Sequence, residues 1–233
     1  MVKDHIQRGD YTYKIAPRLI FSAIRISDPI IAAFLLLLFV EKFTTLSDVF
    51  NNGPSVIFLT CLLLSALKQV FWAWVLSRER FTWFMALFPW NNILDWLWIY
   101  FLSQALNSNQ QIYPWIYIGA ILFVIGVSLE FMSDFQLYLF KRDTNNTGKL
   151  YTSGLFSLVI HPNYTGYILW RTALPLMTGY LWLAGISFLV HIAQFYFHAD
   201  PPFQRYMSAK YDQAWEKYVA SHKKNCSREF FDS

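Results

Sequence analysis

Long runs of apolar residues, separated by short polar segments, make up most of the chain. A helix needs about 20 consecutive apolar residues to cross the hydrocarbon core of a bilayer. Six runs approach that length, at residues 29–40, 54–76, 82–106, 112–140, 164–176 and 180–198. The first is short for a crossing unless it extends backwards through residues 19–26. This pattern predicts an all-α fold, a polytopic transmembrane bundle of about six spans.

The composition supports the same class. The chain has 233 residues, of which 55% are hydrophobic and 15% are charged, whereas a soluble domain carries about 25% charged residues. These values exclude disordered, collagen-like and coiled-coil chains and argue against a soluble globular domain. Because no internal repeat or long linker divides the sequence, we expect residues 1–233 to form a single integral membrane domain.

The basic residues set the expected orientation. In multi-pass proteins, Lys and Arg gather in the connections on the cytoplasmic side. Basic segments lie at residues 3–25, 78–80, 141–149 and 205–224, and the connections between them, at 42–48, 107–111 and 178–180, hold one Lys and no Arg. This alternation predicts that both termini are cytoplasmic. The formal net charge of +4 is spread over several loops, so we expect membrane lipid and no nucleic acid as a partner.

Some ionisable groups fall inside the predicted spans, where they are costly and often functional. Lys68 and Asp95 either form a structural ion pair across a helix interface, or Lys68 extends its ammonium group to the membrane surface. Glu130, Asp134 and Lys141 are spaced by four and seven residues, which places them on one helical face. That face either lines a buried polar site or is a solvated helix end.

A polar turn follows the fourth run. The loop at residues 145–154 leads to the sequence His161-Pro162-Asn163-Tyr164-Thr165-Gly166. Pro162 can begin a helix because the first turn does not need its missing N–H. The other N–H groups of that turn attract anions, so the turn is a candidate ligand site. The alternative is an ordinary helix start with aromatic residues at the membrane interface.

The C-terminal tail has its own periodicity. A helix break is expected at residues 198–202, and apolar or aromatic residues then recur every three to four positions over residues 204–224, with Lys and Arg between them. This pattern predicts a C-terminal cytoplasmic amphipathic helix. Such a helix would either dock on the membrane surface or close over a cofactor bound at the polar turn.

An ordered series of residues between 126 and 218 resembles the C-terminal half of the membrane-embedded steroid 5-alpha-reductase and sterol-reductase superfamily. The series comprises Glu130, Asp134, Gln136 and Phe140, then Thr152-Ser153-Gly154-Leu155-Phe156, then His161-Pro162-Asn163-Tyr164 with Gly166 and Trp170, and finally Lys210-Tyr211, Trp215 and Tyr218. The resemblance implies that residues 126–218 are a cofactor-binding half. It further implies a reductase that passes a hydride from NADPH to a carbon–carbon double bond of a lipophilic substrate, in the endoplasmic reticulum if the source is eukaryotic.

The resemblance also implies roles for single residues, and no metal site. The catalytic proton donor would be Tyr164, with Glu130 as the other candidate. The cofactor would be bound at the cytoplasmic face by His161, Asn163, Gly166, Lys141, Lys149, Gln136, Asp134, Trp215 and Tyr218.

Two alternatives to the reductase stay open. Isoprenylcysteine carboxyl methyltransferases share the architecture and a near-identical histidine-proline-serine-tyrosine motif, and they bind S-adenosylmethionine instead of NADPH. Asn163 stands where these methyltransferases usually have serine, whereas Tyr167 stands where sterol reductases typically have an acidic residue. The other alternative is a non-catalytic, lipid-binding relative that keeps the fold without the chemistry.

Several positions depart from the pattern of both families. Ile160 replaces the arginine that normally precedes the His-Pro pair, Phe203 and Gln204 replace acidic residues, and Asp212 replaces a glycine. The missing arginine removes a bidentate contact to phosphate or carboxylate that lysine cannot fully imitate. Either one of Lys141, Arg142, Lys149 and Arg171 compensates for it, or the affinity for the cofactor is weak or lost.

Overall fold

The computed structural model describes residues 11–78, 80–87, 90–108 and 112–231, and every regular element in these ranges is a helix. This confirms the predicted all-α class. Part of the expected basic N-terminal segment (residues 3–10), part of the connection at 107–111 and the side chains of residues 223–231 lie outside the description. The principal helices are α1 (Ile15–Phe39), α2 (Leu46–Asn51), α3 (Gly53–Phe71), α4 (Trp83–Leu87), α5 (Trp90–Asn107), α6 (Tyr113–Arg142), α7 (Pro162–Leu176), α8 (Leu181–Gln194), α9 (Asp200–Tyr211) and α10 (Gln213–Phe231).

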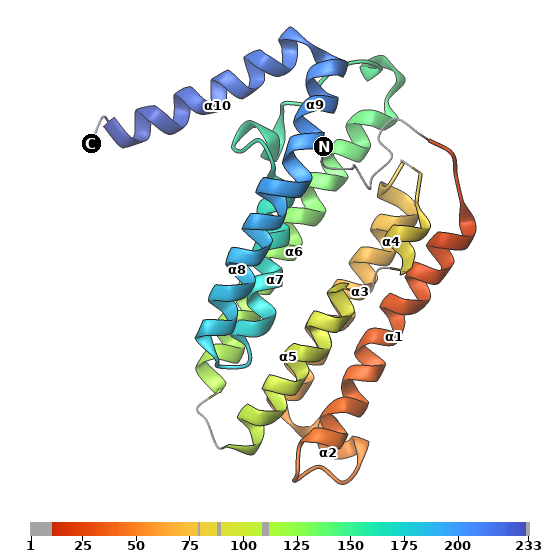
Figure 1. The fold of residues 1–233 in the computed structure, drawn as a ribbon, viewed down its shortest axis with the longest axis vertical. Helices are drawn as coiled ribbons and strands as arrows, with labels where there is room; N and C mark the ends of the chain where they lie inside the picture. The colour runs from red at the N-terminus through yellow and green to blue at the C-terminus, as the bar shows by residue number, and fades with distance from the viewer. Residues whose placement is uncertain (1–10, 79, 88–89, 109–111, 232–233) are drawn as a thin grey trace.

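Within the described residues, four helical stretches are long and apolar enough to cross a membrane: Ile15–Phe39, Gly53–Leu76, Tyr113–Arg142 and Leu181–Tyr211. Large apolar side chains on their outer faces are exposed, among them Leu38, Ile121 and Leu189, as lipid contact requires. The chain is therefore an integral membrane protein. Helices α5 and α7, of 18 and 15 residues, run alongside these four in the bundle (Figure 1).

The first span extends backwards, as its length required. The first helix begins at Ile15, and the polar residues Arg18, Arg25 and Asp28 are buried inside the bundle instead of ending the span. The helix break expected at residues 198–202 is wrong. There α8 continues through a π-helical turn, Phe195–Ala199, into α9, whose prolines occupy the first turn, where no N–H is needed.

The tail consists of two helices that meet at a sharp elbow. Asp212, between α9 and α10, has a φ of 43° and a ψ of −125°. From this point α10 leaves the bundle at an angle (Figure 1). The start of α1, the connection between α6 and α7, and α9 all lie at this end of the molecule (Figure 1).

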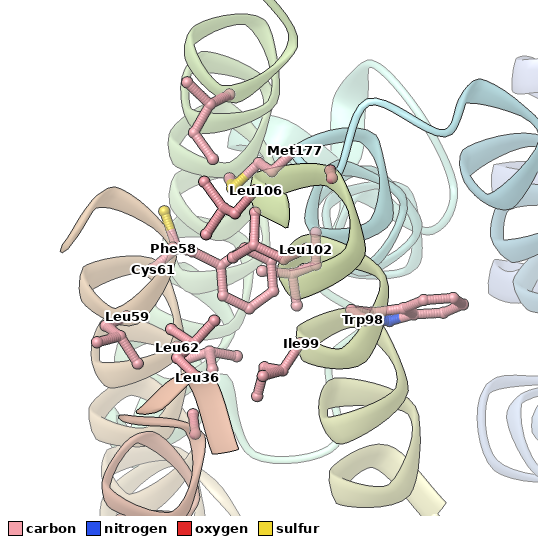
Figure 2. Packing of buried hydrophobic residues seen from close by; sticks show 14 of the residues in the cluster. Leu36, Phe58, Leu59, Cys61, Leu62, Trp98, Ile99, Leu102, Leu106 and Met177 are labelled. Carbon is pink, nitrogen blue, oxygen red and sulfur yellow. The ribbon is translucent and has the colours of Figure 1, made fainter. Parts of the chain in front are cut away.

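An apolar core joins the N-terminal helices. Figure 2 shows Leu36 of α1, Phe58 and Leu62 of α3, and Ile99 and Leu102 of α5 in one cluster. These five side chains are fully buried. The same cluster continues to α6 and α7, so the two halves of the chain share one core.

Glycines allow α6 and α7 to pack closely. A Cβ atom added at Gly166 would meet the backbone N of Glu130 and lie 2.7 Å from the carbonyl oxygen of Gly126. A Cβ atom added at Gly126 would lie 2.6 Å from the backbone N of Trp170. Backbone atoms cannot yield as a side chain can, so this crossing requires glycine on both helices. It fixes the polar residues of α6 against the start of α7.

Candidate functional site

The turn before α7 is built around stacked rings. His161 is the residue before the helix, and Pro162 occupies its first turn and is buried. The imidazole of His161 stacks on Tyr164, with centroids 4.6 Å apart, and Tyr164 stacks in turn on Phe195 of the α8–α9 junction at 4.3 Å. The ring of Phe203 meets the His161 imidazole edge-on at 5.1 Å. Tyr164 is thus held between two rings.

A carboxylate from α9 approaches the same imidazole. Nε2 of His161 lies 2.9 Å from Oδ1 of Asp200. Burial lowers the pKa of His161, although the Asp200 carboxylate acts in the opposite direction. His161 is therefore neutral near pH 7.

The acidic face of α6 lies against the same end of α7. The amide Nδ2 of Asn163 donates to Oδ1 of Asp134 at 3.3 Å. One turn earlier, Oε2 of Glu130 accepts a hydrogen bond from the indole N–H of Trp170 at 2.5 Å. The same oxygen forms an ion pair with Nζ of Lys68, also at 2.5 Å. Glu130 and Asp134 are therefore half-buried against α7, whereas Lys141, further along the same face, is exposed.

This geometry corrects the expected pairing of Lys68 with Asp95. Lys68 pairs with Glu130 of α6, and Asp95 pairs with Arg171 of α7, with Oδ1 and Nη1 2.7 Å apart. The sequence pattern located all four ionisable groups but could not pair them, because helix rotation and crossing decide which charges meet.

Gln136 connects α6 to the loop before α7. Its side-chain oxygen accepts a hydrogen bond from the backbone N–H of Leu155 at 3.1 Å. Gly154, which precedes Leu155, has a φ of 61° and leaves no room for a side chain against the Gln136 amide. Gln136 is therefore placed to shape this loop.

The tail packs back onto the turn. The indole N–H of Trp215 donates to Oε1 of Gln204 at 3.0 Å, and its ring meets Phe203 edge-on at 5.8 Å. The hydroxyl of Tyr218 donates to the carbonyl oxygen of Phe156 at 2.6 Å. Burial raises the pKa of Tyr218 to about 12. An open hollow of about 270 Å³ lies in the angle between α9 and α10, lined by Gln204, Ser208, Trp215, Glu216, Val219 and Ala220.

The remaining expected site residues lie in different surroundings. Lys141, near the end of α6, and Lys149, in the following loop, are both exposed. Gly166 lies in the α6–α7 contact described above. Arg171 is completely buried in its pair with Asp95, so the expectation that it compensates for the arginine missing at Ile160 is wrong.

Sequence reasoning missed a second polar cluster inside the bundle. Nε1 of Trp96 donates to Oδ1 of Asp28 at 2.9 Å, which joins α5 to α1. Asp28 and the nearby Arg25 of α1 are both buried. The sequence feature that could have revealed this cluster is the pair of charged residues at positions 25 and 28, which both lie within α1.

Trp170 lies between the Lys68–Glu130 and the Asp95–Arg171 ion pairs. Its ring is completely buried, with Nζ of Lys68 4.9 Å and the guanidinium carbon of Arg171 5.0 Å from the ring centroid. Both distances are within the range of a cation–π interaction. The indole N–H meanwhile binds Glu130.

Comparison with known proteins adds a family and a partial relative. Residues 68–224 match the family model described as "Protein of unknown function (DUF1295)". A 94-residue stretch is 40% identical to the probable O-methyltransferase ustE of Ustilaginoidea virens, and it covers 40% of this chain and 31% of that protein. No solved structure matches the chain. Since the family model covers more than half of its residues, the chain belongs to the DUF1295 family.

Proposed function

We propose that the chain is a membrane-embedded methyltransferase that uses S-adenosylmethionine to methylate an oxygen atom of a lipophilic substrate. The observation that carries this proposal is the charge of the site. Three carboxylates, those of Glu130, Asp134 and Asp200, are in direct contact with residues of α7 or its first turn. The partial match to a probable O-methyltransferase supports the same reaction class.

The charges favour a cationic cofactor over a phosphorylated one. Lys68 is already paired with Glu130, and His161 is neutral near pH 7. Asp134 has the neutral amide of Asn163 as its hydrogen-bond partner. A pyrophosphate beside these groups would meet net negative charge, whereas the sulfonium of S-adenosylmethionine would be attracted. The absence of an arginine at Ile160 removes a phosphate contact and is consistent with this choice.

The aromatic residues of the site suit the same cofactor. Tyr164, Phe203 and Trp215 form one cluster with His161. Aromatic faces attract cations and also stack on flat heterocycles such as adenine. When bound, S-adenosylmethionine supplies an electrophilic methyl group.

The chain's own residues would orient the cofactor and exclude water. Glu130 and Asp134 would face the positive charge, and Asn163 would hold Asp134 in place. Tyr164, expected from the resemblance to be a proton donor, is fixed between His161 and Phe195, so we assign it a role in shaping the site. Trp215 and Tyr218 would cover the site from the tail.

The bundle supplies the lipophilic substrate from the bilayer. We propose six crossings, with α5 and α7 as the two beyond the four long apolar helices, and both termini in the cytosol. The start of α7 would then lie at the cytoplasmic face, where S-adenosylmethionine is present. In a eukaryotic source, the family resemblance favours the endoplasmic reticulum.

NADPH-dependent reduction is the second candidate, favoured by the exposed Lys141 and Lys149. These lysines end α6 and precede α7, so they can reach an anionic cofactor. Asn163, in place of the methyltransferase serine, fits the reductase motif. In this case the hydride would pass to a carbon–carbon double bond of a lipophilic substrate.

One binding experiment separates the candidates. Purified full-length protein in lipid nanodiscs is titrated with S-adenosylmethionine and, separately, with NADPH by isothermal calorimetry. We expect saturable binding of S-adenosylmethionine, weakened about tenfold by Asp134→Asn. Asp143→Asn, at an exposed acid just beyond α6, is the matched control and should leave affinity unchanged. Binding of NADPH alone would replace the proposal with the reductase, and binding of neither would favour a non-catalytic lipid-binding protein.

A further inference from the structure

We infer that Lys68 is a positioning residue for the cofactor's sulfonium, acting through Glu130. The inference rests on the proposed function and deepens it. The sequence suggested a structural ion pair between Lys68 and Asp95. The contacts of Lys68 instead place it beside Glu130, in the polar lining of the site.

Three helices converge on one carboxylate oxygen. Nζ of Lys68 from α3 and Nε1 of Trp170 from α7 both lie 2.5 Å from Oε2 of Glu130 on α6. The side chains of Lys68 and Glu130 are only 8% and 14% exposed. The ammonium also lies 4.9 Å from the centroid of the Trp170 ring. The triangle fixes both the rotamer and the direction of the carboxylate.

These two contacts use one oxygen of the carboxylate. Both end on Oε2, and in the proposed complex Oε1 would face the positive group of the cofactor. Asp134, one turn further along α6, presents a second carboxylate on the same face. A sulfonium in front of Oε1 and Asp134 would complete the charge balance of the lining.

Lys68 compensates the charge of Glu130 in this setting. An unpaired charge inside the low-dielectric bundle is costly. The carboxyl group of Asp134, one turn away on the same helix, cannot take the place of a cation. From α7, the nearest cation beyond the Trp170 ring is Arg171, which is paired with Asp95. Lys68 is thus the cation that directly contacts Glu130 and offsets its charge.

A purely structural role for the Lys68–Glu130 pair would give a different result. Loss of the pair would then loosen the bundle and lower the affinity for every ligand alike. A positioning role affects only the ligand whose positive charge Glu130 recognises.

The test uses two ligands that differ by one methyl group and one charge. Affinities of the full-length protein in nanodiscs for S-adenosylmethionine and for the neutral thioether S-adenosylhomocysteine are measured between pH 6.5 and 8.5. For Lys68→Met we expect S-adenosylmethionine to bind about tenfold more weakly throughout this range, because the Glu130 carboxylate is no longer held in place. Binding of S-adenosylhomocysteine should change little at any pH.

Matched variants keep the inference falsifiable. Lys68→Arg preserves the charge and should retain most of the affinity, while Glu130→Gln should remove the preference for the charged ligand at every pH. Lys42→Met, at an exposed lysine between α1 and α2, should have no effect. Equal weakening of both ligands by Lys68→Met, or no weakening at any pH, would overturn the inference alone. Failure of the unaltered protein to bind S-adenosylmethionine would overturn the proposed function, and this inference with it.

Discussion

Asp95 and Arg171 form an ion pair in the interior of the bundle, with 2.7 Å between Oδ1 and Nη1 and side chains 1% and 0% exposed. The pair joins α5 to α7. Ser187 of α8 adds a hydrogen bond to the backbone oxygen of Arg171 at 3.1 Å. Because both charges are removed from water and from lipid, each depends on the other.

Removing one member of this pair should be more harmful than removing both. Asp95→Leu leaves the guanidinium of Arg171 uncompensated, and we expect a loss of about 3–5 kcal/mol in the free energy of unfolding. The double variant Asp95→Leu with Arg171→Met should recover most of that loss. Thermal unfolding in detergent measures both. If the double variant is no more stable than the single one, the pair does not carry the stability assigned to it.

Gly166→Ala should disrupt the contact between α6 and α7. The added methyl group meets the backbone of Glu130, and such overpacking costs about 1–3 kcal/mol. The control is Gly185→Ala in α8, where nothing lies within 4 Å of the added Cβ and the better helix propensity of Ala stabilises by up to about 1 kcal/mol. A lower midpoint of thermal unfolding for Gly166→Ala alone is the expected result, and equal midpoints would argue against close packing at this crossing.

The stability of the protein should fall on acidification, in part through His161. Its pKa is lowered in the folded state by burial, so below the ordinary histidine value of about 6.5 the unfolded chain binds more protons at this position. The contribution is therefore fully present above that pH and is lost as the pH falls.

His161→Phe is the variant that checks this effect. Phenylalanine keeps a ring against Tyr164 but does not titrate. Unfolding midpoints measured between pH 7.5 and 5.5 should decline less steeply for His161→Phe than for the unaltered protein. Identical pH dependence in the two proteins would show that His161 is not the responsible group.

The helix pattern was predictable because it depends on local periodicity and run length. The runs at 54–76, 112–140 and 164–176 coincide closely with Gly53–Leu76, α6 and α7. For α1, run length alone suggested an extension backwards through residues 19–26 but not its start at Ile15, since the partner of Asp28 inside the helix, Trp96, comes from α5. Contacts between distant segments decide whether such a charge lies inside a helix or beyond it.

The residues of the site were predictable from the sequence, but the contacts between them were not. Spacing placed Glu130 and Asp134 on one face, and the motif brought Asn163 to the same place. The partner of Glu130, Lys68, lies 62 positions away and could not be assigned from sequence, because pairing depends on how α3 and α6 are rotated. For the same reason the sequence suggested Arg171 as a substitute for the arginine missing at Ile160, whereas it is buried in its pair with Asp95.

The elbow at Asp212 provides another test. A residue with a side chain at a φ of 43° is strained by about 1–3 kcal/mol. Asp212→Gly should relieve this strain and raise the unfolding midpoint, although the greater freedom of glycine in the unfolded chain offsets part of the gain. Ser208→Gly, within α9, is the control and should lower the midpoint. A decrease with Asp212→Gly would mean that the aspartate stabilises the elbow.

The hydrogen bond from Trp96 to Asp28 has a practical consequence for work on this family. The family match begins at residue 68, yet Asp28 belongs to α1, well before that point. A shortened chain cut at the family boundary would leave the indole N–H of Trp96 facing acyl chains, together with an unshielded Arg171–Asp95 pair. The first helix is therefore no detachable anchor, and expression of the matched region by itself should yield aggregated material.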